Sequence, residues 1–329
     1  MANNPIRVGM IRCDSHAMFY GVLMDEADPD RIRVPQPATS KLSDGWWPNG
    51  AIHRFFYTRP ADPTNMTIGR VDGFQITRLW DEDRRTAEVF AHVFNDRPRV
   101  CDSLDQVSDE VDLVFIADCN FDGSDHIELA SPGLNKGVPT FVDKPFGGTS
   151  ANGRKLAELA QAHGAPICTG SILSAMPATD QFESRFAEFG DVHHLSIEGC
   201  GSSTAGLIHA IALAQRLFGT KIVGVRALVG TSQTYILLDY GGPPVVGGVG
   251  IVCNCGGPYS GMYAHAFGEG GCVEAVFNDF KYAFGAKRIV ERIRDMVRSG
   301  ATPRRDVDDM LAALQTLDAV RAALDQGTD

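Results

Sequence analysis

The stretch Gly137-Val-Pro-Thr-Phe-Val-Asp-Lys-Pro-Phe-Gly-Gly148 decides the fold that we predict for this chain. Its apolar residues 138–142 predict a short buried strand, and Asp143, Lys144 and Pro145 follow at the carboxyl end of that strand. In an open parallel sheet, ligands bind outside the carboxyl ends of the strands. Lys144 is therefore either a charge exposed in a turn, as most lysines are, or a group placed against a substrate.

Strand and helix patterns alternate on both sides of this stretch. Buried strands are predicted at 6–12, 74–80, 112–117 and 166–169, and helices at 15–24, around 87–94, at 126–136 and at 150–163. This alternation needs right-handed crossovers and predicts a parallel, doubly wound sheet. Residues 25–72 interrupt it, being rich in Pro, Asp, Asn and Gly, and a loop of that length is usually functional.

The pattern changes beyond about residue 170. Strands at 192–198, 222–229, 234–240, 245–253 and 272–277 are separated by Gly-rich turns, which predicts an antiparallel meander with one packed face. A helix at 204–218 interrupts the strands, and two amphipathic helices close the chain. The expected fold class is α/β: a doubly wound parallel (Rossmann) sheet followed by an α+β domain with an open, mainly antiparallel sheet.

Composition excludes several classes of protein. The 329 residues carry a formal charge of -11, which argues against a nucleic acid partner because phosphates would be repelled. No apolar run is long enough to span a membrane, and the start of the chain lacks the pattern of a signal peptide, so we expect a cytoplasmic protein. The eight cysteines are scattered, and we expect them to be reduced and no metal to be bound.

Several motifs occur in an order that resembles the glucose-fructose oxidoreductase/inositol dehydrogenase (Gfo/Idh/MocA) family. They are Phe141-Val-Asp-Lys-Pro145, the helix segment Gly206-Leu-Ile-His209, and the ending at 293–303 before a last amphipathic helix. The resemblance covers almost the whole chain except 25–72. It implies a dinucleotide-binding Rossmann-like domain at 1–148, which contains the insertion 25–72. It also implies a substrate and oligomerisation domain at 149–329, whose C-terminal helix packs back on the first domain.

The family resemblance also implies an activity. It predicts an NAD(P)-dependent oxidoreductase that acts on a hydroxyl or keto group of a sugar, polyol or related small molecule, and that forms a homodimer or homotetramer. Lys144 is then expected to reach the substrate oxygen and His209 to act as the acid or base, since histidine titrates near neutral pH. A histidine that merely lines the core is the alternative for His209.

The cofactor is expected to be NAD rather than NADP, because Asp81 ends the second strand, where an acid bonds the ribose hydroxyls. Asp81 as a plain helix cap is the alternative. The resemblance places the remaining cofactor contacts at Arg12, Asp14, Ser15, His16, Asn120, Asp143, Lys144 and Pro145. Further candidates for contacts with the substrate are Trp46, Trp47, His126 and Asp180.

The chain departs from the family at two places. Arg12 and Asp14 stand where the Gly-x-Gly-x-x-Gly turn has glycines, so side chains obstruct the approach of a pyrophosphate, which puts cofactor binding in doubt. Arg12 or His16 could instead supply donors, and this chain resembles a divergent subgroup with an altered glycine loop. The second departure is Ala205, where the family has an aspartate one turn before the histidine. Candidate replacements are Ser202, Ser203 and Asp180.

These departures leave two other functions open. One is a redox-neutral lyase, isomerase or hydrolase on the same scaffold, with bound NAD or without it. The other is a homologue that binds a ligand without catalysis, because fold alone does not determine function. A metal at Asp122, Asp125 and His126 has only weak support from their spacing in a loop.

Overall fold

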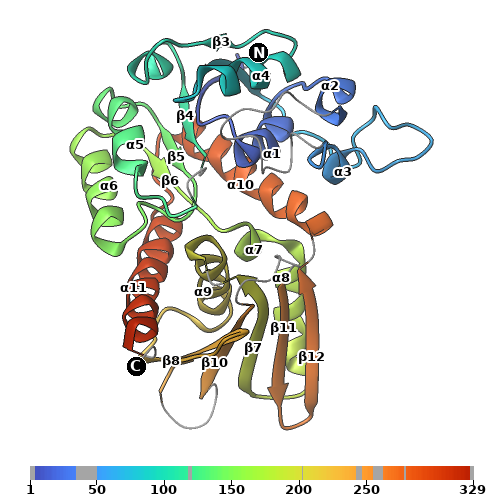
Figure 1. Cartoon of the computed structure of the whole chain (residues 1–329), viewed down its shortest axis with the longest axis vertical. Coiled ribbons are helices and arrows are strands. Elements are labelled where there is room, and N and C mark those ends of the chain that lie inside the picture. The colour runs from blue at the N-terminus through green and yellow to red at the C-terminus, as the bar shows by residue number, and fades with distance from the viewer. Residues whose placement is uncertain are drawn as a thin grey trace.

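The computed structural model describes residues 4–34, 50–117, 121–201, 203–241, 247–254, 262–277 and 279–326. These residues form two six-stranded sheets, with most of the helices beside the first sheet or between the two (Figure 1). The first sheet has the order β3-β2-β1-β4-β5-β6 and is parallel throughout. Its strands are β1 (Ile6–Ile11), β2 (Phe74–Trp80), β3 (Arg99–Val100), β4 (Leu113–Ile116), β5 (Thr140–Val142) and β6 (Ile167–Cys168).

Helices cover both faces of the first sheet, as the strand-helix alternation predicts. The connecting helices are α1 (Ser15–Met24), α4 (Arg84–Val93), α5 (His126–Asn135) and α6 (Ser150–Ala162), with the short η1 (Asp105–Ser108) before β4. In Figure 1, α5 and α6 lie on one side of β5 and β6, whereas α1 and α10 (Asp279–Ser299) lie on the other. The central strands β1 and β4 are buried on both faces, which explains their continuous apolar sequences.

The insertion 25–72 is not the uninterrupted loop that we predicted. Its described part contains α2 (Pro29–Arg33) and α3 (His53–Phe56). Phe55 and Phe56 of α3 are buried and pack on Phe19 of α1, with ring centroids 5.2 and 5.1 Å away. Apolar burial has therefore fixed this segment against the Rossmann core, despite its loop-like composition. Trp46 and Trp47 lie outside the described residues.

The second sheet has the order β12-β11-β7-β10-β9-β8. Its strands are β7 (Val192–Gly201), β8 (Gly224–Val229), β9 (Gln233–Asp239), β10 (Gly248–Asn254), β11 (Met262–Gly268) and β12 (Gly271–Phe277). The sheet is mainly antiparallel, as expected, but β7 and β10 pair in parallel, so the simple meander was wrong at this point. The chain leaves β7 through α9 (Thr204–Phe218) to the far edge, and three strands then lead back until β10 lies beside β7.

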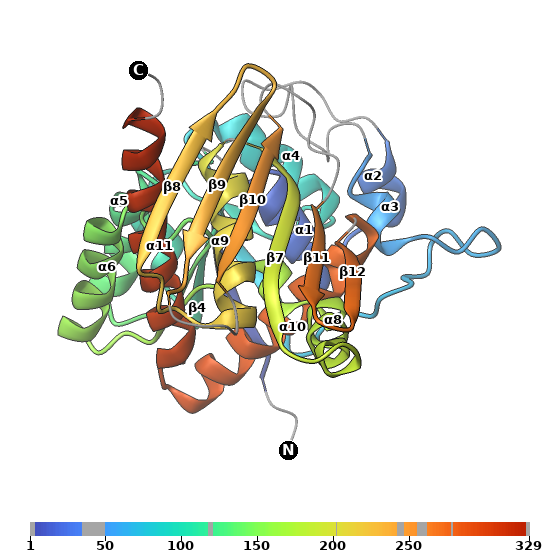
Figure 2. The same ribbon diagram turned by 90° about the horizontal axis from the view of Figure 1, so that it is seen from below.

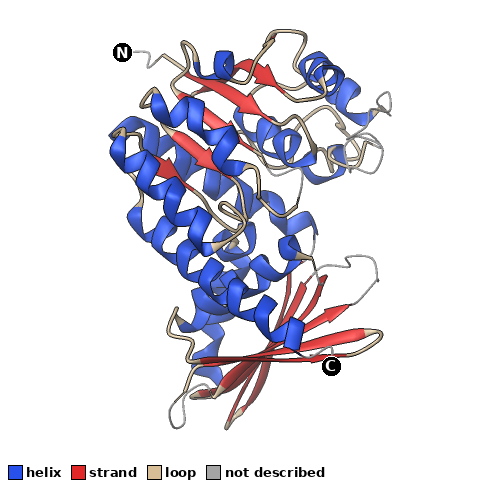
Figure 3. Cartoon of the chain, turned by 60° about the vertical axis from the view of Figure 1, so that its left-hand side comes forward, coloured by secondary structure: helices blue, strands red, loops and turns tan. Residues whose placement is uncertain are grey.

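Within the described residues, helices cover one face of this second sheet (Figure 3). They are α9, α7 (Ile172–Ala175), α8 (Pro177–Ser184), η2 (Arg185–Glu188), α10 (Asp279–Ser299) and α11 (Arg304–Gln326). The other face, turned toward the viewer in Figure 2, is open. Along β9, Ile236 and Leu238 point into the core, whereas Tyr235 and Leu237 are 48% and 38% exposed. The open face therefore carries apolar side chains.

The C-terminal helix α11 contacts α9 and β8 of the second half and α6 and β6 of the first sheet. The parallel sheet takes its last strand, β6, from beyond residue 149. A division by sheets would consequently fall after Cys168, and the predicted division into 1–148 and 149–329 stays a prediction. None of the described helices is long and apolar enough to cross a membrane.

Candidate functional site

The turn after β5 places Asp143, Lys144 and Pro145 at the carboxyl edge of the parallel sheet. Asp143 is 1% exposed and Lys144 is 3% exposed, so Lys144 is not a surface charge. The Lys144–Pro145 peptide bond is cis. Gly148 follows with φ +76°, and a Cβ there would lie 2.5 Å from the carbonyl oxygen of Asp122. Glycine thus allows the turn to pack directly against the loop that precedes α5.

His16, in the first turn of α1, forms an ion pair with Asp143. Its Nδ1 lies 2.6 Å from Oδ2 of Asp143, and the other carboxylate oxygen accepts the backbone N–H of Lys144 at 2.8 Å. Burial by itself would lower the pKa of His16, but the Asp143 carboxylate outweighs it and the pKa of His16 rises. Burial likewise opposes ionisation of Asp143, yet His16 and Lys144 lower the pKa of that carboxyl. The pair is therefore predominantly ionic at mildly acidic pH.

His209, on α9, lies on the same side of the sheet edge. Burial, followed by the positive charges of Lys144 and His16, holds the pKa of His209 well below its ordinary value. Its Nδ1 lies 2.8 Å from Oγ of Ser171, in the loop between β6 and α7. Ser171 therefore bonds the imidazole, and our candidate replacements for the missing aspartate did not include it.

A cavity of about 40 Å³ lies beside His16 and His209, and Tyr20 and Tyr282 also form part of its wall. Asp143 and Lys144 do not line this cavity. The hydroxyl of Tyr20 is buried and has no hydrogen-bond partner among the described residues. Burial, with the nearby Asp143 carboxylate, raises the pKa of Tyr20 well above its ordinary value, so this hydroxyl stays protonated. Tyr20 follows His16 by one helical turn, and that spacing was the sequence signal that we missed.

The turn after β1 is built from side chains instead of glycines. Arg12 has φ +67°, the left-handed conformation that usually favours glycine. Its guanidinium is buried and forms ion pairs with Glu82, at 3.0 Å, and with Asp125. Asp14 caps α1, its carboxylate accepting the backbone N–H of Ala17 at 3.0 Å. Arg12 thus links three loops across the crevice at the carboxyl ends of β1, β2 and β4.

Asp81 ends β2 as predicted, but its carboxylate is engaged by the protein backbone. One oxygen accepts the N–H of Cys13 at 2.9 Å, and the other accepts the N–H of Asp83 at 3.0 Å. The residue is 4% exposed. Asp81 therefore stabilises the turn after β1. The prediction that Asp81 bonds the ribose of a cofactor did not include this structural role.

The remaining predicted site residues are more scattered. His126 begins α5 and is fully buried, and burial lowers its pKa. Asp180 on α8 pairs with Arg216 at 3.1 Å and with Arg288 at 2.6 Å, and not with His209. Ser203 caps α9 through the N–H of Gly206. Asn120 and Ser202 lie outside the described residues. Within the part of the chain that the structure describes, no group of three or more His, Cys, Asp or Glu is placed to hold a metal ion.

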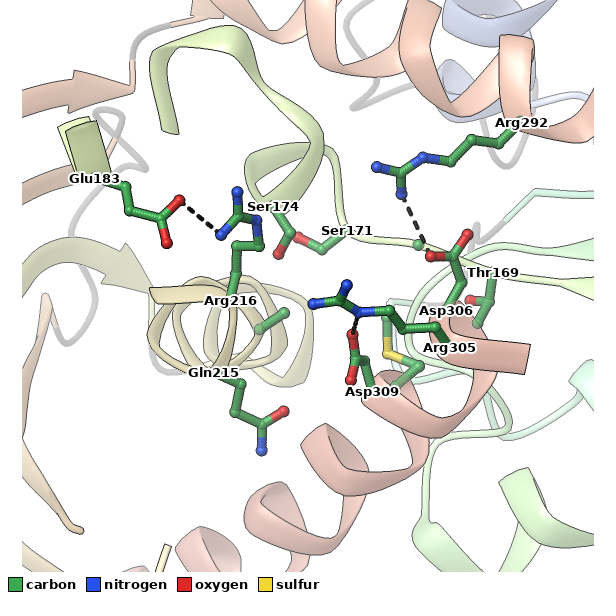
Figure 4. A pocket seen from close by; sticks show the side chains of 13 residues that line it. Thr169, Ser171, Ser174, Glu183, Gln215, Arg216, Arg292, Arg305, Asp306 and Asp309 are labelled. Carbon is green, nitrogen blue, oxygen red and sulfur yellow. Dashed lines mark hydrogen bonds and ion pairs between the residues drawn. The ribbon is translucent and has the colours of Figure 1, made fainter. Parts of the chain in front are cut away.

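A larger cavity of about 470 Å³ lies farther from Lys144, between α7, α8, α9, α10 and α11 (Figure 4). Its wall is mostly polar and includes Ser171, whose hydroxyl bonds His209. Neither His209 nor Lys144 belongs to this wall. Ser171 lines the larger cavity, and its hydrogen-bond partner His209 lines the smaller one.

Comparison with family models gives a match that lies mostly in the first half of the chain. Residues 61–171 match the Gfo/Idh/MocA model, described as an oxidoreductase family with an NAD-binding Rossmann fold. The matched segment makes up about a third of the chain. The matched residues include Asp81, Lys144 and Ser171, and they begin inside the insertion. Comparison with curated proteins found no match.

Solved structures of Gfo/Idh/MocA-type oxidoreductases share the fold over nearly the full length. The chain is 16% identical to a myo-inositol dehydrogenase from Corynebacterium glutamicum, with a TM-score of 0.68 and coverage of 98% of this chain and 97% of the other. Myo-inositol 2-dehydrogenase from Lactobacillus plantarum gives 13% identity, a TM-score of 0.71 and 98% coverage of both chains. GenD2 from gentamicin A biosynthesis, solved in complex with NAD, is 16% identical to this chain, with a TM-score of 0.67. The match covers 99% of this chain and 95% of GenD2. The predicted fold class is confirmed, and residues 61–171 match a family of oxidoreductases.

Proposed function

We propose that this protein is an NAD(P)-dependent oxidoreductase that acts on a hydroxyl or keto group of a sugar, polyol or related small molecule. One observation carries the proposal: Lys144, His209 and the His16–Asp143 pair gather, largely buried, at the carboxyl edge of a Rossmann sheet. That edge is where ligands bind in this architecture. Perturbed ionisable groups in such a place are typical of catalytic sites.

The residues after β1 and β2 would hold a dinucleotide although Arg12 and Asp14 replace two glycines of the usual loop. Arg12 keeps the left-handed backbone of the turn, and α1 still presents its amino-terminal end to the crevice. The Arg12 guanidinium would hold the pyrophosphate, because it offers several hydrogen-bond donors in a fixed geometry. The pyrophosphate would then replace Glu82 and Asp125 as the partner of Arg12. Carboxylates at the end of β2 favour NAD over the extra phosphate of NADP.

Lys144 and His209 would have different roles toward the substrate. The bound nicotinamide supplies or accepts the hydride. The Lys144 ammonium would donate a hydrogen bond to the substrate oxygen and polarise it. His209 is neutral at neutral pH because its pKa is depressed, so it can accept the hydroxyl proton during oxidation. The tautomer that donates Nδ1–H to Ser171 leaves Nε2 as the accepting atom.

The His16–Asp143 pair and Tyr20 set the electrostatics around these groups. Asp143 balances part of the charge of Lys144 and His16, while His16 helps to keep the proton off His209. Tyr20 brings an unpartnered hydroxyl to the same cavity. A cavity of 40 Å³ holds little more than one water molecule, so α1 and α10 must separate locally to admit a sugar. Closure behind the substrate would then exclude water.

We also propose that the open face of the second sheet joins a second copy of this chain. Its exposed apolar side chains include Leu228, Tyr235, Tyr263 and Phe267. A contiguous apolar sheet face is unusual on a monomer. Tyr235→Glu combined with Phe267→Glu should convert a dimer or tetramer to smaller species in sedimentation analysis, and an unchanged mass would argue against this interface.

Mass and absorbance of nucleotide released on denaturing freshly purified protein test the cofactor directly. Calorimetry with NAD and NADP, followed by nicotinamide absorbance with a panel of polyols and sugars, tests the activity. We expect NAD binding, reduction of NAD by at least one polyhydroxy compound, and loss of that reduction in Lys144→Ala with NAD binding retained. Turnover of a carbohydrate with no net change in nicotinamide would instead indicate the redox-neutral alternative. Failure of both nucleotides to bind would refute the proposal.

A further inference from the structure

The larger cavity has the size and chemistry of a ligand site. Its volume of about 470 Å³ falls within the usual range for small-molecule sites. Gaps between packed helices are normally filled by apolar side chains, but this wall carries three arginines, three carboxylates, three hydroxyls and an amide. Figure 4 shows that these groups come from several helices that are far apart in the sequence. Such convergence of polar groups needs either a ligand or ordered water.

Two of the three arginines are only loosely paired. Nη1 of Arg292 lies 3.5 Å from Oδ1 of Asp306, and Nε of Arg305 lies 3.7 Å from Oδ2 of Asp309. Both separations exceed the roughly 2.7–2.9 Å of a good charge-assisted hydrogen bond. Arg216, by contrast, donates to Glu183 at 2.9 Å. Arg292 and Arg305 therefore keep donors available for another acceptor.

Arginines and carboxylates are equal in number in this wall, but two further features favour an anion. The 23-residue helix α11 begins here, so the positive end of its dipole faces the same space. Burial raises the pKa of the Asp306 carboxyl in spite of Arg292, so Asp306 compensates the arginine less readily than an ordinary aspartate. An incoming anion would be a better partner for the two guanidinium groups than these carboxylates.

Uncharged polar groups complete the wall. Oγ1 of Thr169 and Oε1 of Gln215 are buried and have no hydrogen-bond partner within the described residues, and their residues are 3% and 6% exposed. Buried polar atoms without partners are rare because each is costly to leave unsatisfied. Hydroxyl groups on a ligand, which both donate and accept, would match Thr169, Gln215 and Ser171 after small side-chain rotations.

We propose that this cavity is a second binding site, separate from the catalytic crevice, for a small hydroxylated anion such as a sugar acid or sugar phosphate. The anionic group of this ligand binds Arg292 and Arg305. The hydroxyl groups of the ligand bind the side chains of Thr169, Ser171 and Gln215. The site does not depend on the proposed function. Because Ser171 also bonds His209, an occupant that binds the Ser171 hydroxyl changes how the imidazole is held. The site is thus placed to regulate the crevice.

Calorimetry on the purified full chain with 6-phosphogluconate, inorganic phosphate and sorbitol tests the site. We expect saturable binding of 6-phosphogluconate, weaker binding of phosphate and none of sorbitol. Arg305→Met should weaken 6-phosphogluconate binding about tenfold, the usual effect of losing a charged hydrogen bond. Because the Arg305 side chain is 88% exposed, this variant should fold normally. Arg292→Met should act similarly, and Asp309→Asn should tighten binding by removing a competing carboxylate.

Arg298→Met is the matched control, since Arg298 lies on α10 but outside the cavity wall. Three results would overturn the proposal: absence of saturable 6-phosphogluconate binding, equal affinity in the Arg305→Met, Arg292→Met and Arg298→Met variants, or loss of binding in Lys144→Ala. The last result would place the anion in the catalytic crevice. Binding that survives Lys144→Ala and saturating NAD supports a separate site.

Discussion

The turn after β5 and the turn after β1 lie at the same edge of one sheet, yet they are built in opposite ways. The turn after β5 keeps the Lys-Pro motif of the family, and glycines let it pack closely against its neighbours. The turn after β1 replaces glycines with Arg12 and Asp14, and ion pairs hold it in place. Under the proposed function, the turn after β5 serves the substrate and the turn after β1 serves the cofactor, so the two turns can be tested separately.

The largest expected effect tests the retained turn. Lys144→Ala should lower turnover by at least ~10²-fold, the usual scale for losing an acid/base or polarising group. Lys144→Arg should restore little, because a guanidinium has a different shape and does not titrate. Steady-state kinetics measure both, and an unchanged circular dichroism spectrum is the control for folding. Near-normal turnover in either variant would contradict a direct role for Lys144.

The rebuilt turn predicts a smaller effect, on cofactor affinity. Arg12→Gly should weaken NAD binding about tenfold, because the guanidinium would hold the pyrophosphate. Glu82→Gln should tighten it, since Glu82 competes for Arg12 at 3.0 Å. Calorimetry measures both, with Glu88→Gln, on the exposed surface of α4, as the control. Tighter binding in Arg12→Gly would show that the side chain obstructs the cofactor.

A pH profile distinguishes the two turns further. His209 must be deprotonated to accept a proton, so the acid limb of kcat for oxidation should lie below pH 6.5, the ordinary histidine value. His16→Gln removes a positive charge and leaves Asp143 without its partner, and both changes raise the pKa of His209. The limb should therefore move to higher pH. His92→Gln, on the surface of α4, should leave the profile unchanged. An unmoved limb in His16→Gln would remove His209 as the titrating base.

The smallest expected effect concerns stability. The raised pKa of His16 contributes stability that is complete below its unfolded value and is lost as pH rises through the folded value. The lowered pKa of Asp143 contributes stability that is lost as pH falls through its folded value. The pair should stabilise most between about pH 4 and 6.5. Melting temperatures should fall by a few degrees in His16→Gln within that window, and an equal fall at pH 9 would exclude the ion pair as the cause.

The sequence predicted the regular elements well because their periodicity is local. The helices at 15–24 and 204–218 match α1 and α9, and the strand at 74–80 matches β2. The sequence-based prediction failed where the pairing of strands distant in the sequence determines the sheet. The two residues of β3 are too few to show a pattern, β11 was missed, and no local signal shows that β7 and β10 run in parallel.

The sequence predicted only the part of the candidate site that depends on local motifs and on chain order. Lys144, Asp143, His16 and His209 come together at the sheet edge because motifs and chain order place them there, although their roles stay predictions. Ser171 was missed because its contact with His209 joins two elements 38 residues apart. The backbone bonds of Asp81 and the arginine partners of Asp180 are likewise tertiary, and no spacing in the sequence encodes them.

The pairing of β7 also bears on how the chain is synthesised. This strand lies in the middle of its sheet, but its neighbours β10 and β11 are the third and fourth strands to follow it from the ribosome. Until residues 248–268 have emerged, β7 has two unpaired edges, which are sites for pairing with other chains. Nascent chains that end before β10 should consequently depend most on chaperones, and mutations that slow the β8–β9–β10 hairpins should lower the yield of folded protein without changing its final stability.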